Sequence, residues 1–277
     1  MRSLVAVVAV VLAMPLVGRA GGQVPQAAMD PALRTAYEMF YNGRFTEAAT
    51  ATAELCTANV AALPACELRT SALHFQIRRA MGDAKDRKKA LAQCAPCADL
   101  LSTFVAETRR AQETARAGLK AAPGDEDTLF LLGKLDLNYV WLQLGTLDRK
   151  TGWDEYWEAR NSLDAVLKEH PGHVRAKVAR AWVDYIVDTR MPRGTRWVLG
   201  GGDKKRGMQA MREAAAAEGS TFVRAEAGFA LWDMQVREKD MAGARATAKL
   251  LANDYPTNPD LRKFLDAPGT NSGLTSR

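Results

Sequence analysis

The segment ARNSLDAVLKEHP at residues 159–171 has two counterparts in the chain: AQETARAGLKAAP at residues 111–123 and ARATAKLLANDYP at residues 244–256. In each segment an alanine lies twelve residues before a proline. A small residue where two helices touch, followed by a proline that ends the second helix, is typical of stacked helix-hairpin repeats. The spacing therefore predicts a helical repeat scaffold, and scaffolds of this kind usually bind other proteins.

Apolar residues recur at helical spacing through most of the chain after Asp30, and runs of β-branched residues are rare there. We therefore predict an all-α fold. Asp30-Pro31 marks a helix start, because aspartate caps the amino terminus and proline fits the first turn. Asn42-Gly43 predicts the end of this helix, and Arg44 begins its partner. These signals predict a first helix hairpin near the start of the chain.

Several segments resemble the tetratricopeptide repeat (TPR), a helix–turn–helix unit of about 34 residues. Residues 41–48 look like its tight turn, and residues 123–133 resemble its proline, polar turn and first helix, with Leu132-Gly133 matching a Leu-Gly pair. Residues 158–171 resemble its second helix, and residues 244–259 repeat that ending. The resemblance implies TPR-like helix hairpins stacked as an α-solenoid, with partners bound on the concave face.

We expect four parts along the chain. They are a signal peptide over residues 1–20, N-terminal helical hairpins with disulfides over 30–122, TPR-like repeats with two loop insertions over 123–266, and a disordered tail over 267–277. The second part is expected to be a helical cap, because an exposed end repeat leaves an apolar face open to water.

The first twenty residues are typical of an export signal. Met1 and Arg2 form a short positive start, residues 4–17 are mostly apolar, and Gly18-Arg19-Ala20 offers small residues for cleavage. A membrane span needs roughly 20 apolar residues. We therefore expect cleavage, a periplasmic or secreted location, and no membrane span afterwards. The net charge of +6 over the whole chain is too small to indicate nucleic-acid binding.

The four cysteines fit an oxidising compartment. They allow three connectivities, and we favour Cys56 with Cys66 and Cys94 with Cys97, because each pair is close in sequence. A C-x-x-C motif also occurs in thiol oxidoreductases, where it opens a helix after a strand. Here the flanks are predicted to be helical on both sides. A structural disulfide is therefore preferred over redox catalysis and over a metal site of four thiolates.

The spacing between repeats predicts two insertions. A period of about 34 residues places a closing proline about 22 residues before the next contact alanine. Here 36 positions separate Pro123 from Ala159, and 36 separate Pro171 from Gly207, which stands in the place of the alanine. The extra residues are expected near 142–156 and 189–203. Insertions at the same point of neighbouring repeats emerge on the same side of a stack and can touch.

Tryptophan and arginine are the residues most enriched at binding hot spots, and both occur in the predicted insertions and on the predicted concave face. The candidate partner-binding residues are Trp141, Trp153, Trp157, Trp182, Tyr185, Arg190, Arg193, Arg196, Trp197 and Trp232. The alternative is that Trp153, Trp157 and Trp197 fix long loops to the stack, while the arginines are solvated or paired with carboxylates.

The sequence predicts no catalytic residue, metal site or cofactor. The chain has three histidines, of which His170 and His173 flank a predicted turn without a cysteine ligand nearby. Gly200-Gly201-Gly202-Asp203-Lys204-Lys205 lacks the spacing and the preceding strand of a phosphate-binding loop. A flexible turn with Asp203 capping the helix from Lys204 is the preferred interpretation.

A weaker resemblance concerns residues 199–205, LGGGDKK, and the predicted helix after them, which are similar to the helical T-components associated with TRAP-type periplasmic transporters. That resemblance covers roughly residues 189–256 and implies a role in uptake of an apolar or organic-acid ligand. We expect a non-enzymatic, exported helical-repeat scaffold that binds an unidentified protein or peptide through its concave face and paired loops. The alternative is a periplasmic accessory of a TRAP-like system that binds a small organic molecule.

Overall fold

The computed structural model describes residues 29–217 and 219–267, and these form helices and connecting turns without a strand. The all-α prediction is confirmed for this part of the chain. The predicted signal peptide, and the predicted tail apart from Ala267, lie outside the described residues.

The helices of the first half are α1 (Pro31–Tyr41), α2 (Phe45–Ala53), the short 3₁₀ helix η2 (Val60–Ala62), α3 (Leu63–Met81), α4 (Arg87–Gln93) and α5 (Cys97–Ala121). The second half contains α6 (Glu126–Val140), the π-helical turn η3 (Trp141–Thr146), α7 (Trp153–Glu169), α8 (Val174–Arg190), α9 (Arg193–Arg196), α10 (Lys204–Ala216), α11 (Thr221–Arg237), α12 (Met241–Asp254) and α13 (Pro259–Asp266).

The first hairpin forms as its local signals predict. The Asp30 side chain accepts hydrogen bonds from the backbone N–H groups of Ala32 and Leu33, and Pro31 occupies the first turn of α1. Gly43, with φ of 75°, turns the chain into α2, and a residue with a side chain is strained in this left-handed conformation. Both helix boundaries therefore follow from capping chemistry.

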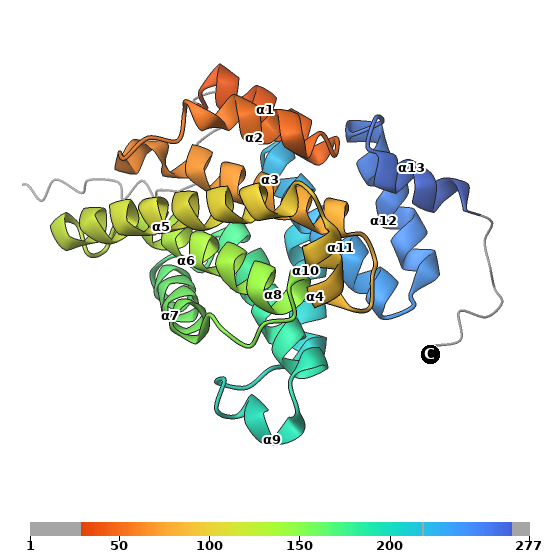
Figure 1. The fold of residues 1–277 in the computed structure, drawn as a ribbon. Coiled ribbons are helices and arrows are strands. Elements are labelled where there is room, and N and C mark those ends of the chain that lie inside the picture. The colour runs from red at the N-terminus through yellow and green to blue at the C-terminus, as the bar shows by residue number, and fades with distance from the viewer. Residues whose placement is uncertain (1–28, 218, 268–277) are drawn as a thin grey trace, which may run out of the picture.

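The helices pair into five hairpins: α1 with α2, α3 with α5, α6 with α7, α8 with α10, and α11 with α12 (Figure 1). The first helix of each hairpin is called an inner helix below, so the inner helices are α1, α3, α6, α8 and α11. The alanines of the three alanine–proline segments, Ala111, Ala159 and Ala244, are buried. Ala159 of α7 is buried, and a Cβ atom added to Gly133 of α6 would lie 3.3 Å from its carbonyl oxygen.

The two ends of the described chain contact each other. The Asn258 side chain donates a hydrogen bond to the Tyr41 carbonyl oxygen (2.7 Å), and the rings of Tyr37 and Phe222 stack with centroids 5.1 Å apart. Figure 1 shows the resulting proximity of α13 and α1. The helix α1, which belongs to the expected N-terminal cap, thus packs against α11 and the start of α13.

The predicted insertions differ in form. Residues 141–146 continue α6 as the turn η3, and α7 begins at Trp153, so the insertion expected at 142–156 contains only a short loop. The insertion expected at 189–203 is an extended excursion that includes α9, which projects from the body of the molecule in Figure 1. Asp203 caps α10 by accepting from the Arg206 N–H (2.9 Å), which confirms the predicted helix start.

Candidate functional site

Four charged side chains from four inner helices meet inside the molecule and form the inner charge cluster: Glu67, Lys134, Arg175 and Glu226. Glu226 accepts from Lys134 Nζ (2.6 Å) and from Arg175 Nε (2.6 Å). Glu67 pairs with Arg175 Nη2 (3.3 Å) and lies 3.7 Å from Lys134 Nζ. Each anion therefore faces both cations, and each cation faces both anions.

The surroundings complete the charge compensation. Burial acts to raise the pKa of Glu226, but the cations of Arg175 and Lys134 outweigh it and hold that pKa below its usual value. The Arg175 guanidinium also lies over the Phe130 ring, 4.7 Å from the centroid. This cluster satisfies its own charges, so its chemistry is that of an internal ionic link between helices.

The inner helices place most of the predicted concave-face residues in internal contacts. Tyr185 is only 2% exposed and donates a hydrogen bond to Glu238 Oε1 (2.9 Å), so its assignment as a partner contact is corrected: its side chain is part of the packing between α8 and α11. Trp182 contacts Tyr185 and Arg237, and Trp232 packs on Phe264. Trp141 packs against the core between α6 and its neighbours.

A second buried ionisable side chain, Asp136, lies between α5, α6 and α7. Asp136 is fully buried and accepts a hydrogen bond from Gln112 Nε2 (2.6 Å). Burial and the charge of Glu158, which is itself paired with Arg116, raise the pKa of Asp136 to about 9. The protonated acid is therefore the form present at neutral pH.

The excursion between α8 and α10 is fixed to α7 at one point. Tyr156 Oη and Arg160 Nη1 both donate to the Leu199 carbonyl oxygen, at 2.8 Å and 3.0 Å, and Arg160 Nη2 donates to the Gly200 carbonyl oxygen at 2.8 Å. Leu199 itself is buried. The second insertion is thereby brought against the helix that begins at Trp153.

Large apolar side chains remain exposed around this anchor. Trp197 is 78% exposed and Val198 is 51% exposed, although they directly precede the buried Leu199. Trp153 and Trp157 at the start of α7 are also exposed, and their rings contact the ring of Tyr156, which holds the loop. The predicted proximity of the two segments is thus supported by a chain of direct contacts.

The arginines of this region divide into two kinds. Arg190 and Arg193 are exposed and make no ion pair or hydrogen bond with the described residues. Arg196 instead pairs with Asp188 and donates to the Met191 carbonyl oxygen (3.1 Å), so its charge has a partner within the loop. We call Trp153, Trp157, Arg190, Arg193, Trp197 and Val198 the outer Trp/Arg surface.

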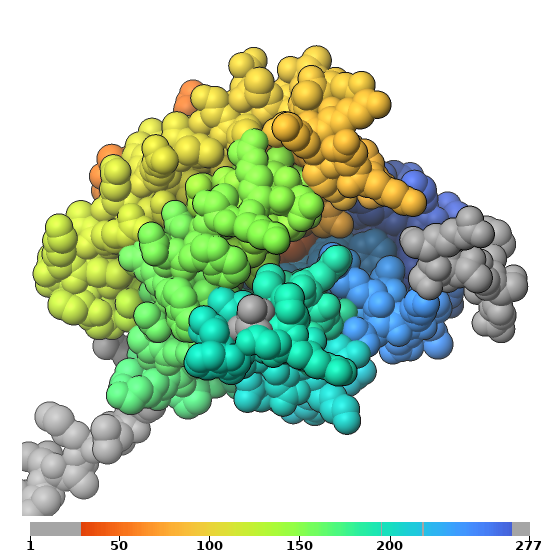
Figure 2. Space-filling model, turned by 60° about the horizontal axis from the view of Figure 1, so that its bottom comes forward, coloured from red at the N-terminus to blue at the C-terminus, as the bar shows by residue number. Residues whose placement is uncertain are grey.

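Figure 2 shows a recess on the side of the molecule where the inner helices end, bordered by the α3–α4 region in orange, the η3 region in green, the α9 region in teal and α12 in light blue. Two cavities are defined elsewhere. One of ≈ 290 Å³ lies beside α4, and one of ≈ 630 Å³ lies between the residues before α3 and the second half of α5. Neither of these two is lined by the predicted tryptophans.

The histidines are engaged separately. His173 caps α8 by accepting from the Ala176 N–H (3.0 Å), His170 lies 3.3 Å from Glu126, and His74 Nε2 is 2.8 Å from Thr146 Oγ1. Burial lowers the pKa of His74 to about 3 and that of His173 to about 4. Each of the three rings therefore has a structural partner, and the rings of His74 and His173 stay neutral near pH 7.

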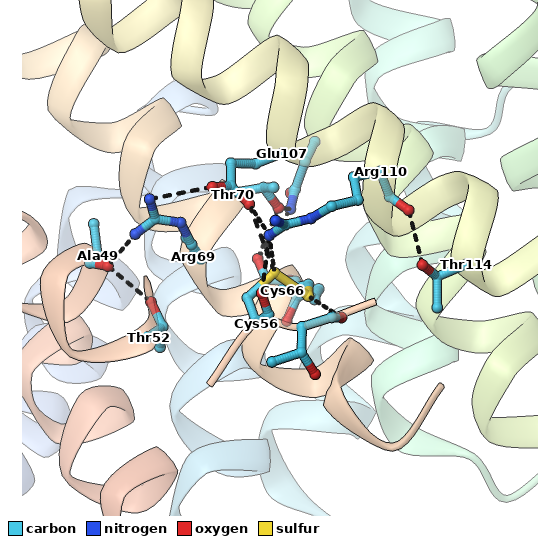
Figure 3. Close-up of a disulfide and its surroundings, with 12 residues drawn as sticks. Ala49, Thr52, Cys56, Cys66, Arg69, Thr70, Glu107, Arg110 and Thr114 are labelled. Atoms are coloured by element: carbon cyan, nitrogen blue, oxygen red, sulfur yellow. Dashed lines mark hydrogen bonds and ion pairs between the residues drawn. A yellow bond between two sulfur atoms is a disulfide. The ribbon is translucent and has the colours of Figure 1, made fainter. Parts of the chain in front are cut away.

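Both predicted disulfides are confirmed, since Cys56 pairs with Cys66 and Cys94 with Cys97. The first is buried where α5 crosses the start of α3 (Figure 3). Arg110 Nη2 lies 3.4 Å from Cys56 Sγ and donates to the Cys56 carbonyl oxygen (2.9 Å), and Glu107 joins Arg110 to Arg69. The disulfide is thus enclosed by an arginine–carboxylate chain.

Comparison with known proteins gave no relative: no family model matches the chain, and neither the curated proteins nor the solved structures contain a significant match. Within the described ranges no helix is long and apolar enough to cross a bilayer.

The inner charge cluster is the feature that sequence reasoning missed. A signal was present at Glu226, whose neighbours Ala225 and Ala227 are both buried. A charged residue within an apolar helical stretch indicates burial with a partner. The identity of its partners is not encoded locally, because Lys134 is 92 positions and Arg175 is 51 positions away from Glu226.

Proposed function

We propose that this chain is an exported, non-enzymatic scaffold of TPR-like helix hairpins with an N-terminal helical cap, and that it binds a protein or peptide partner. The outer Trp/Arg surface is the proposed contact. One observation carries the proposal: Trp197, 78% exposed, lies on a loop that Tyr156 and Arg160 fix in place. An anchored, exposed aromatic loses little conformational freedom when it binds.

The composition of the surface supports a protein partner. Tryptophan and arginine carry large shares of binding energy at protein interfaces. Arg190 and Arg193 have their charges available, because no described carboxylate pairs with them. The more usual TPR site, the centre of the concave face, is partly filled here by the inner charge cluster and by packed aromatic residues. The outer surface is therefore the better candidate.

Export is part of the same proposal. Two disulfides are typical of proteins from oxidising compartments, and they are consistent with the signal-like first twenty residues. The TRAP-like alternative, binding of a small organic molecule, receives less support because neither described cavity is lined by Trp182 or Trp232.

The test is affinity capture from the native envelope fraction, comparing the wild-type chain with a Trp153→Ala, Arg193→Ala, Trp197→Ala variant. A matched control carries Lys249→Ala and Leu250→Ala, which remove an exposed cation and an exposed apolar side chain from α12. We expect a specific protein to be retained by the wild type and the control and to be lost, at least tenfold, from the triple variant.

Circular dichroism first establishes that all three forms keep equal helicity. Retention of the same protein by the triple variant would contradict the proposed surface. If no form retains a protein, the binding-module proposal fails, and titration with small organic acids becomes the appropriate experiment.

A further inference from the structure

The two disulfides differ in the features that control reaction with thiols. Cys56 and Cys66 are both buried beneath Arg110 and Glu107. Cys94 is half-buried and lines the cavity of ≈ 290 Å³ beside α4. We propose that Cys94–Cys97 is a thiol–disulfide exchange site for dithiols, whereas Cys56–Cys66 is a permanent structural bridge. This site is separate from the outer Trp/Arg surface and adds a redox function to the proposed scaffold.

Access determines which sulfur is attacked. Cys97 is fully buried, so an incoming thiolate reaches Cys94. The cavity at Cys94 is lined by small and apolar side chains with one charge of each sign. Its residues are Ala80, Met81, Ala84, Asp86, Lys89, Ala90, Gln93 and Cys94. A volume of this size and an open wall suit a small dithiol or a narrow, exposed cysteine-containing loop of a protein.

The helix position of Cys97 favours it as the leaving group, whereas its burial in an apolar cluster opposes this. It is the first residue of α5, a helix of 25 residues whose amino terminus has no side-chain cap. The partial positive charge of a helix amino terminus stabilises a thiolate there, although Asp99 in the same turn opposes this effect. A thiolate that is more stable leaves faster from a disulfide.

Opening this disulfide also disturbs little of the fold. It joins residues only three apart in sequence, against ten for Cys56–Cys66, and a disulfide that closes a short loop restricts the unfolded chain least. The helix α4 on its amino-terminal side contains no buried residue. Reduction therefore leaves the hydrophobic core in place, and the reduced form is a stable product.

The exchange is balanced with a dithiol as the only co-reactant. A thiolate of the dithiol attacks Cys94 Sγ, a mixed disulfide forms, and the Cys94–Cys97 bond breaks with its electron pair leaving on Cys97 Sγ. The second thiol of the reductant loses its proton and attacks the first, which releases Cys94 as a thiolate. In total the dithiol is oxidised to a disulfide, and the cysteine pair gains two electrons and two protons.

The test uses the intact wild-type protein in graded mixtures of reduced and oxidised dithiothreitol at pH 7. Free thiols are trapped with N-ethylmaleimide, and peptide mass spectrometry assigns them to each pair. We expect Cys94 and Cys97 to become alkylated while Cys56 and Cys66 stay oxidised, with reduction constants at least tenfold apart, which corresponds to about 30 mV. Equal reduction of both pairs, or reduction of neither before denaturant is added, would overturn the proposal.

Single variants test the order of attack. Cys97→Ser leaves the accessible Cys94 thiol, and Cys94→Ser leaves the buried Cys97 thiol. We expect the Cys97→Ser protein to react with a chromogenic aromatic disulfide at least tenfold faster than the Cys94→Ser protein. The reverse order would show that Cys94 is not the attacked sulfur. Partner capture in the wild type is unaffected by either result, so failure here is distinguishable from failure of the binding proposal.

Discussion

Arginine and aromatic side chains meet in two regions of this molecule, with opposite outcomes. In the inner charge cluster, Arg175 lies over Phe130 and pairs with Glu226 and Glu67. On the outer Trp/Arg surface, Arg193 has no carboxylate partner among the described residues. The same side-chain chemistry thus links helices in one region and remains available for binding in the other. The two regions contain the same residue types, and they differ in whether neighbouring carboxylates compensate the arginine charge.

The largest expected effect comes from breaking the inner charge cluster. Arg175→Met removes one cation and leaves Glu226 and Glu67 with Lys134 alone, and breaking a buried ion pair on one side costs about 3–5 kcal/mol. The matched control is Arg193→Met on the outer surface, with a change below about 0.5 kcal/mol. Urea unfolding followed by circular dichroism measures both free energies. Equal losses in the two variants would remove the distinction between the regions.

Asp136 sharpens the comparison, because it is a buried carboxyl that stays neutral instead of being paired. Its pKa is raised to about 9 in the folded state, so the unfolded chain releases this proton at lower pH than the folded chain. This group therefore lowers the free energy of unfolding progressively as the pH rises from about 4 to about 9.

Asp136→Asn keeps an oxygen to accept from Gln112 and removes the titration. We expect the variant to be more stable by about 5 kcal/mol at pH 8 and nearly equal to wild type at pH 4, because each pH unit between the two pKa values contributes about 1.4 kcal/mol. Thermal unfolding of both proteins across this pH range is the measurement. A stability difference that does not grow with pH would mean that Asp136 is ionised in the folded protein.

A smaller effect is expected where the outer surface is anchored. Arg160→Ala removes the two hydrogen bonds to Leu199 and Gly200, which costs about 1 kcal/mol and loosens the loop. Limited trypsin digestion should then cut after Arg190 or Arg193 several-fold faster than in wild type. Arg237→Ala, on the neighbouring helix α11, is the control. An unchanged cleavage rate would indicate that Leu199 burial and the Tyr156 hydrogen bond hold the loop without Arg160.

Local signals predicted much of the fold. The Asp30-Pro31 start, the Asn42-Gly43 break and the Asp203 cap each act within one turn of helix, so the sequence is sufficient to place them. The candidate surface was predicted less well. Trp197 and Arg193 are exposed as expected, but Tyr185 and Arg196 have internal partners, because helix phase and loop path decide exposure and a single sequence constrains both only loosely.

The sequence by itself determined the helical class, the hairpin boundaries and both disulfide pairs, because these depend on residues close together in the chain. The tertiary structure alone decided the contact of α13 with α1, the meeting of Glu67 with Arg175, and the exposure of Trp197 beside the buried Leu199. These features join segments separated by tens to hundreds of positions. Their energies come from burial and charge compensation, which exist only after the hairpins have packed.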